Sequence, residues 1–157
     1  MRTTITTGLI DSAAVEAFTR GQCHALALAM AEATGWPTGV LCQPECDAAG
    51  CEDDFCNEPL IADNVCACQL LHLVALRPDG CLVDINGVHD PDRVPGFEEC
   101  PVLVTTQEVW SHILSASDWR RPALAAARTF VARCWSRWLC RMSSSPCGDS
   151  SPAHPII

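Results

Sequence analysis

Three residues in the first two thirds of the chain have side chains that together could carry out nucleophilic catalysis. Cys23 lies in the first turn of a predicted helix, His72 in a predicted strand, and Asp84 in the predicted strand that follows. The thiolate is the nucleophilic form of cysteine, a histidine can accept the thiol proton, and a carboxylate can orient that histidine. This set of residues predicts acyl transfer through a thioester on Cys23.

The position of Cys23 favours a reactive thiol. Thr19 and Gln22 have the spacing of a capping box, the run that follows is rich in Ala and Leu, and Gly35 is a typical C-terminal cap. We therefore expect a helix that begins after Thr19. The free N–H groups at such a helix start lower the pKa of a thiol, and the Cys23 amide with the Gln22 side chain could donate to an oxyanion. The alternative is that Cys23 is a small buried core residue.

A predicted hairpin would bring the histidine and the carboxylate together. Residues 69–76 and 81–85 read as strands that a Pro-Asp-Gly turn connects. A three-residue turn puts His72 opposite Asn86 and two positions from Asp84, so all three share one face, whereas a one-residue slip would separate them. The alternative is that Asp84 and Asn86 only end a strand in a turn, and that His72 is a core histidine.

Two other histidines are less suitable bases. Neighbouring residues on a helix do not face each other, so His24 should point away from Cys23. His89 stands beside an Asp-Pro pair and is expected in a loop.

The order of these residues resembles the papain-like superfamily of thiol enzymes, which includes papain-fold peptidases, transglutaminase-like proteins and bacterial deamidases. The shared features are Gly-Gln-Cys at a helix start (21–23), a strand bearing a histidine, and a strand reading Val-Asp-Ile-Asn-Gly (83–87). The resemblance covers residues 15–90. One departure is that papain carries its oxyanion-hole Gln several residues before the Cys, whereas Gln22 is adjacent to Cys23.

The resemblance implies an α+β fold in which an N-terminal helix bearing the Cys packs on a small antiparallel sheet, with further helices toward the C-terminus. It implies Cys23 as nucleophile, His72 as base and Asp84 as orienting group, with Asn86 as an alternative. The expected activity is that of a thiol hydrolase or acyl transferase (a peptidase, deamidase or amidase) acting on a protein or peptide amide. Catalysis of this kind requires no cofactor.

The chain also has a cysteine-rich segment, predicted to be an acidic insertion over residues 42–68. Twelve cysteines are present in all, and thiolates with short spacings can form a structural zinc site. Disulfides, or thiols without a role, are the alternatives. A different function, a non-catalytic protein-interaction module held together by metal, would be centred on this segment. The candidate ligands are Cys42, Cys46, Cys51, Cys56, Cys66 and Cys68.

Charge divides the chain into two parts. Residues 1–119 carry 4 Arg and 18 acidic residues, a net charge of −14, whereas residues 120–157 carry 6 Arg and one Asp, a net charge of +5. The first part, predicted to be the main domain, should therefore repel nucleic acid. A basic, Trp-containing helix is predicted over residues 120–142. It could contact a membrane surface or a protein partner, or simply pack on the domain. Residues 143–157 are predicted to be a disordered tail.

The length and composition place the chain in a broad class. With 157 residues, of which 48% are hydrophobic, it suits one domain with a substantial core. No apolar run approaches the length of a membrane span, and the N-terminus does not read as a secretory signal, so a cytoplasmic protein is expected. The remaining predicted elements are a helix over residues 11–18, a strand over 38–41, a surface loop over 90–101, a strand over 102–106 and a helix over 107–116.

Overall fold

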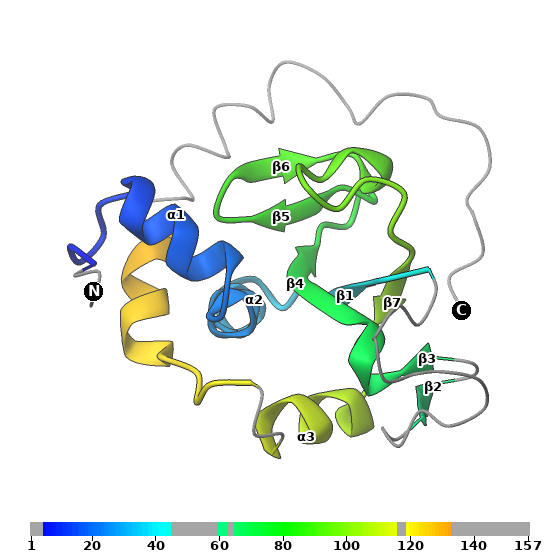
Figure 1. Ribbon diagram of the computed structural model, residues 1–157. Coiled ribbons are helices and arrows are strands. Elements are labelled where there is room, and N and C mark those ends of the chain that lie inside the picture. The colour runs from blue at the N-terminus through cyan, green and yellow to red at the C-terminus, as the bar shows by residue number, and fades with distance from the viewer. Residues whose placement is uncertain (1–4, 45–59, 63–64, 116–118, 133–157) are drawn as a thin grey trace.

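A computed structural model describes residues 5–44, 60–62, 65–115 and 119–132, and these residues form an α+β fold (Figure 1). A five-stranded antiparallel sheet has the order β6-β5-β4-β1-β7, and helices lie on one side of it. A separate two-stranded sheet joins β2 to β3. The labelled helices are α1 (Ser12–Thr19), α2 (Cys23–Thr34) and α3 (Gln107–Ser115). The strands are β1 (Thr38–Cys42), β2 (Leu60–Ala62), β3 (Val65–Cys66), β4 (Leu70–Leu76), β5 (Leu82–Asp84), β6 (Gly87–His89) and β7 (Val102–Val104).

The predicted register of the β4–β5 hairpin is confirmed, but the two strands separate early. Ala75 pairs with Val83 and Leu76 with Leu82, as the three-residue turn requires. The chain then turns back at Asp84 into β6 instead of continuing along β4. The prediction that His72 faces Asn86 is therefore wrong. The first half of β4 pairs with β1 alone in the main sheet, and a wedge opens between β4 and β5.

The start of α2 differs from the prediction. Thr19 is the last residue of α1 and does not cap α2, which begins at Cys23 with Gln22 in the cap position. Gly21 has a φ of +111°, a conformation that favours glycine, so the chain bends sharply between the two helices. The predicted end is confirmed, because Gly35 takes the left-handed conformation of a C-terminal cap. The bend makes Cys23 the first residue of its helix.

The core lies between α2 and the sheet. Helix α2 contacts β4, β1 and β5, and Leu26 and Met30 are buried in a cluster with Phe18 of α1. Burial of a side chain of this size contributes roughly 1.5 to 3 kcal/mol. On the opposite face, Val94 packs with sheet residues, so part of the predicted 90–101 surface loop is buried. The packing fixes α2 on the sheet with its first residue, Cys23, beside β4.

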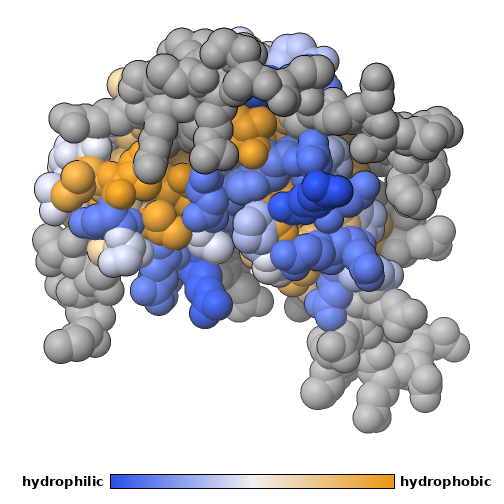
Figure 2. Space-filling model, turned by 90° about the horizontal axis from the view of Figure 1, so that it is seen from above, coloured by the Kyte–Doolittle hydropathy of each residue, from blue (hydrophilic) through white to orange (hydrophobic). Residues whose placement is uncertain are grey.

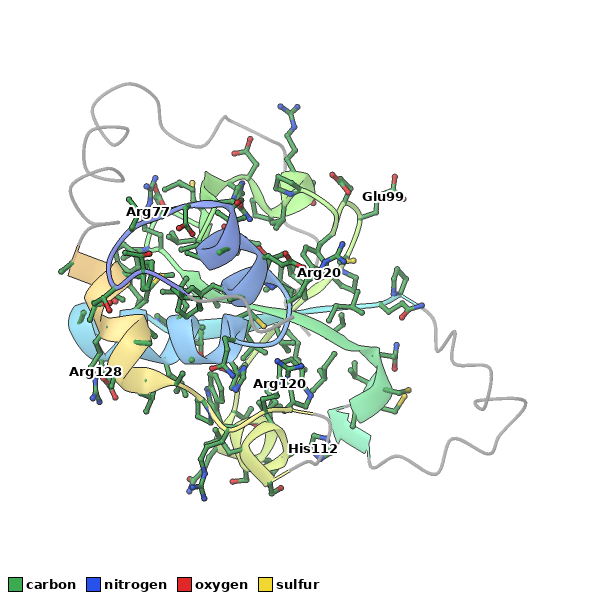
Figure 3. The ribbon with its side chains drawn as sticks, turned by 60° about the vertical axis from the view of Figure 1, so that its left-hand side comes forward. Arg20, Arg77, Glu99, His112, Arg120 and Arg128 are labelled. Carbon is green, nitrogen blue, oxygen red and sulfur yellow. The ribbon has the colours of Figure 1, made fainter. Side chains whose placement is uncertain are left out.

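The predicted helix over residues 120–142 begins later than expected. The described part is helical over 124–132, whereas residues 119–123 are not helical. Proline at position 122 disfavours helical geometry in the residue before it. Phe130 packs edge-on against Phe18 of α1, and Arg128 forms an ion pair with Glu32 of α2 (Figure 3). The 124–132 helix therefore packs on the domain, whereas residues 133–142 and the tail at 143–157 lie outside the described part of the chain.

The surface seen in Figure 2 is divided by polarity. Hydrophobic side chains gather toward the side of α1, and hydrophilic ones lie over the centre and the opposite side. Within the described residues, no helix is long and apolar enough to cross a membrane.

Cys81, which is buried immediately before β5, is disulfide-bonded.

Candidate functional site

The structure places Cys23 beside β4, next to Leu73 and the side chain of His72. Cys23 is only 3% exposed, and its thiol contacts the His72 ring, the adjacent His24 ring and the backbone of Leu73. The Nδ1 atoms of both rings are buried and, among the described residues, form no hydrogen bond of ordinary geometry. The thiol and the rings are thus adjacent without being aligned, which is common in active sites without substrate.

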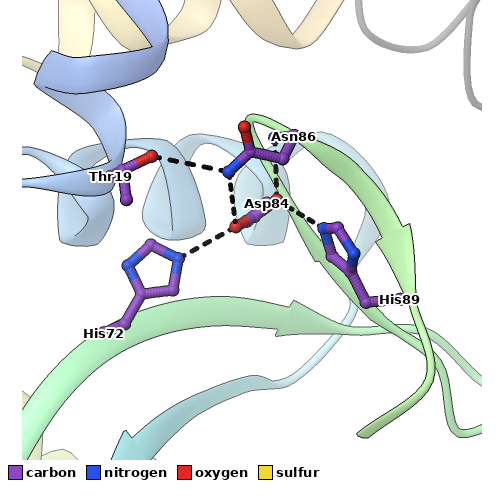
Figure 4. A network of polar contacts seen from close by, with 5 residues as sticks. All are labelled: Thr19, His72, Asp84, Asn86 and His89. Atoms are coloured by element: carbon purple, nitrogen blue, oxygen red, sulfur yellow. Dashed lines mark hydrogen bonds and ion pairs between the residues drawn. The ribbon is translucent and has the colours of Figure 1, made fainter. Parts of the chain in front are cut away.

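Asp84 joins His72 to a second histidine (Figure 4). The Nε2 of His72 lies 3.1 Å from Asp84 Oδ2, and the Nε2 of His89 lies 2.9 Å from Asp84 Oδ1. An ionised carboxylate only accepts hydrogen bonds, so both Nε2 atoms are the donors. With Nε2 of His72 held by Asp84, its Nδ1 is left for the thiol of Cys23.

Asn86 supports Asp84 and does not contact His72. Its backbone N–H donates to Asp84 Oδ1 at 2.7 Å, and its side-chain amide is 3.4 Å from Asp84 Oδ2. The same amide reaches Thr19 Oγ1 at 3.5 Å and so connects the hairpin to α1. This is an Asx-turn, in which the side chain of an Asp accepts a hydrogen bond from the backbone N–H two residues later. The geometry gives the orienting position to Asp84 and none to Asn86.

An aromatic ring fixes the plane of the histidine. Phe97 stacks on His72 with ring centroids 4.7 Å apart and an interplanar angle of 7°. Phe97 comes from the segment that covers the outer face of the sheet, and it was not among the predicted site residues. Stacking in addition to the Asp84 bond restricts rotation of a ring that is fully buried.

The electrostatics of the site favour an ionised pair. Burial opposes ionisation of Cys23, but its contacts with the His24 and His72 rings and the charge of His72 lower the thiol pKa to about 6. Burial likewise opposes protonation of His72, but Asp84 and Cys23 raise its pKa to about 9. Asp84 is buried, yet the two histidines hold the pKa of its carboxyl well below its usual range. The lowered thiol pKa and the raised histidine pKa both favour a thiolate next to an imidazolium at neutral pH.

Gln22 and His24 bind the segment 119–123. The Gln22 amide donates to Arg121 O at 3.3 Å and accepts from Ala123 N at 2.7 Å. The Nε2 of His24 donates to Arg120 O at 2.7 Å. Because both ends of the Gln22 amide have partners, this side chain is not placed as an oxyanion donor here. The N–H groups at the start of α2, which have no preceding helical carbonyl, are better placed for that role.

The predicted metal ligands are only partly described. Cys42 is buried in β1, and the sulfur atoms of Cys66 and Cys68 lie 2.7 Å apart next to β3. Cys46, Cys51 and Cys56 lie outside the described residues. Among the residues that are described, no three His, Cys, Asp or Glu side chains are arranged to hold a metal ion.

Sequence reasoning missed two histidines of the site. His89 was expected in a loop, but it belongs to β6 and bonds to Asp84. His24 was expected to point away from Cys23, yet its ring contacts the thiol. The Asp-Ile-Asn-Gly sequence was the available signal for His89, because a tight turn there returns the chain beside Asp84.

The fold and the site define an α+β protein in which a cysteine at a helix start meets a His-Asp pair on an antiparallel sheet. In comparisons with known proteins, no family model, no curated protein and no solved structure matched the chain. The functional argument therefore depends on the geometry of the site.

Proposed function

We propose that this protein is a thiol-dependent hydrolase or acyl transferase in which Cys23 forms a thioester with its substrate. The observation that carries the proposal is the buried set of Cys23, His72 and Asp84, with a thiol pKa of about 6 beside a histidine pKa of about 9. Buried thiols without such partners have raised pKa values, as Cys42 does at about 11. The contrast between two buried cysteines of one chain supports a chemical role for Cys23.

The reaction follows from the positions of the groups. The Cys23 thiolate attacks the carbonyl carbon of an amide or ester, and a C–S bond forms. The proton on His72 Nδ1 passes to the leaving amine or alcohol as its bond to the carbonyl carbon breaks. Water or an amine then gives a proton to the same nitrogen and attacks the thioester, which releases the Cys23 thiolate. Asp84 keeps the ring oriented through both steps.

The papain-like resemblance is consistent with this proposal and adds the substrate class, an amide of a protein or peptide. The expected stabiliser of the oxyanion is the start of α2, because helix N-termini present unpaired N–H groups and a positive dipole. The reaction requires no metal or organic cofactor.

The test is to trap the thioester. The full chain is incubated with para-nitrophenyl acetate and quenched in acid, and the acetylated residue is located by mass spectrometry. We expect acetyl on Cys23 that hydroxylamine removes, loss of the adduct in Cys23→Ala, and retention in Cys42→Ala, the matched buried control. Acetylation of Cys42 or Cys100 as fast as that of Cys23 would contradict the proposal.

A further inference from the structure

The segment 119–123 covers the start of α2, where the thiol lies. In Figure 1 the chain between α3 and the 124–132 helix passes beside α2. Three hydrogen bonds hold it there: from His24 Nε2 to Arg120 O, from Gln22 Nε2 to Arg121 O, and from Ala123 N to Gln22 Oε1. Residues from 22 to 24 thus bind the 119–123 segment along its length.

Trp119 contributes the apolar part of this cover. Its ring meets His24 edge-on, with centroids 5.4 Å apart and an interplanar angle of 85°. It also packs against the core cluster that contains Cys23. Cys23 is 3% exposed and His24 is fully buried, so a substrate carbonyl must displace part of this cover to reach the sulfur.

Among the described residues, the 119–123 segment makes its polar contacts through its main chain. Two carbonyl oxygens and one N–H bond to the side chains of Gln22 and His24, whereas the side chains of Arg120 and Arg121 are exposed. Contacts of this kind recognise a non-helical peptide backbone and tolerate different side chains at the two Arg positions. The one side chain that is recognised is the aromatic ring of Trp119.

We propose that Gln22 and His24 form a binding site for a polypeptide main chain with an aromatic residue beside Cys23, and that residues 119–123 occupy this site in the resting protein. This inference depends on the proposed function, since it names a protein segment as the substrate of the Cys23 thiolate. The 119–123 segment is then an internal inhibitor, and a substrate peptide must displace it.

The anchors of the segment allow local release. The 124–132 helix is held on α1 and α2 by Phe130 against Phe18 and by the Arg128–Glu32 ion pair. On the other side, Trp110 of α3 donates to Thr38 Oγ1 of the sheet. Because these anchors lie outside 119–123, the segment can open while both helices stay docked.

The test measures access to Cys23. Ala123→Pro removes the N–H that donates to Gln22, and Leu124→Pro is the matched control because proline is tolerated at the first helical position. The rate of Cys23 alkylation by iodoacetamide at pH 7 is followed by mass spectrometry, with Cys42 as an internal reference. Loss of one such hydrogen bond should raise the Cys23 rate roughly 2- to 10-fold. Leu124→Pro should leave the rate unchanged.

A second variant tests the aromatic contact, and a peptide tests the ligand class. Trp119→Ala should also accelerate alkylation of Cys23 without accelerating that of Cys42. In the Ala123→Pro variant, the blocked peptide Trp-Arg-Arg-Pro-Ala should slow the reaction again, and Trp-Arg-Arg-Pro-Pro should do so less. Unchanged rates in both variants, equal acceleration of Cys42, or no protection by the first peptide would overturn the proposal.

The same experiment separates the two proposals. If the opened variant reacts faster but its alkylation midpoint lies near the ordinary thiol pKa of 9.0, the 119–123 segment covers an unactivated cysteine and the proposed function fails. If the midpoint is about 6 and the rate does not depend on the segment, the proposed function stands and this inference fails.

Discussion

Replacing His72 by Gln tests the thiolate–imidazolium pair directly. Gln is neutral, fills much of the same volume and can still donate a hydrogen bond to Asp84. Without the His72 charge, burial of Cys23 is opposed only by its contacts with His24 and the Leu73 backbone. We therefore expect the pH midpoint of Cys23 alkylation to rise from its native value of about 6 toward the ordinary thiol pKa of 9.0, which is the upper limit of the effect.

The size of the expected change in rate decides whether the rate or the pH midpoint should be measured. At pH 7 a thiol of pKa about 6 is about 90% ionised, and one of pKa 9.0 is about 1% ionised. The higher-pKa thiolate is intrinsically more nucleophilic, by roughly 15- to 30-fold over three units. The two effects nearly offset, so the rate at pH 7 should fall only about 3- to 6-fold. The midpoint of the pH profile is the discriminating quantity.

The assay is alkylation of the full chain with iodoacetamide between pH 4 and pH 10, with Cys23 quantified by mass spectrometry. His112→Gln, on α3, is the matched control and should keep the native midpoint. Near-ultraviolet circular dichroism verifies that each variant is folded. A His72→Gln midpoint that stays at the native value would refute the argument that the charge of His72 helps to keep the Cys23 thiol ionised.

Two further substitutions test the carboxylate and its second histidine. His89→Ala should slow acetylation of Cys23 about 10-fold, because Asp84 loses one of the donors that position it. His89→Gln keeps a donor and should recover most of the rate. Equal losses of rate in the two variants would mean that His89 has a merely structural role. Asp84→Asn tests stability. The pKa of the Asp84 carboxyl is lower in the folded protein than its value near 3.9 in the unfolded chain, so the ionised carboxylate stabilises the fold above that pH. This contribution is lost as the pH falls from about 3.9 toward the lower pKa of the folded protein. We expect the variant to be destabilised at pH 7 by about 1 to 3 kcal/mol and to lose less further stability on acidification, measured by urea unfolding from pH 7 to pH 3. A parallel loss in both proteins on acidification would contradict this assignment.

The parts of the site that sequence predicts are those that local chemistry determines. The Pro-Asp-Gly turn and the apolar runs beside it are enough to set the β4–β5 register, which the pair Ala75–Val83 confirms. The C-terminal cap at Gly35 is local in the same way. The α+β class follows from these elements together with the Ala-rich α2.

The parts that sequence does not predict arise where local signals compete. The sequence allows Asp84 either to continue β5 or to begin a turn. In the structure Asp84 is the last residue of β5, and its side chain accepts the hydrogen bond from His72. Gly87, with a φ of +134°, permits the tight return that brings His89 to the same carboxylate. A similar competition at Gly21 ends α1 at Thr19 and removes the expected capping box.

The contacts of the 119–123 segment were beyond sequence reasoning for a different reason. Gln22 and Ala123 are about a hundred positions apart, and neither residue type indicates a partner. Their contact exists because the 124–132 helix docks on α1 and α2, and docking of a helix depends on the whole core. The same docking explains why Gln22, next to Cys23, does not take the predicted position of an oxyanion donor. The Gln22 amide could donate to an oxyanion, but in the structure it is hydrogen-bonded to the backbone of Arg121 and Ala123.

In the structure the thiol of Cys23 has a lowered pKa and is almost completely buried, and these two properties oppose each other. Burial by itself raises the pKa of Cys23, but it also keeps water from screening the contact with His72, so the attraction between the two charges is stronger. Burial also excludes substrate. The 119–123 segment binds Gln22 and His24 on either side of Cys23 with its main chain and one aromatic ring. In the proposal above, a substrate peptide that makes the same contacts replaces the segment without exposing the thiolate to water. Replacement of the 119–123 segment by the substrate peptide then both binds the substrate and gives it access to the Cys23 thiolate.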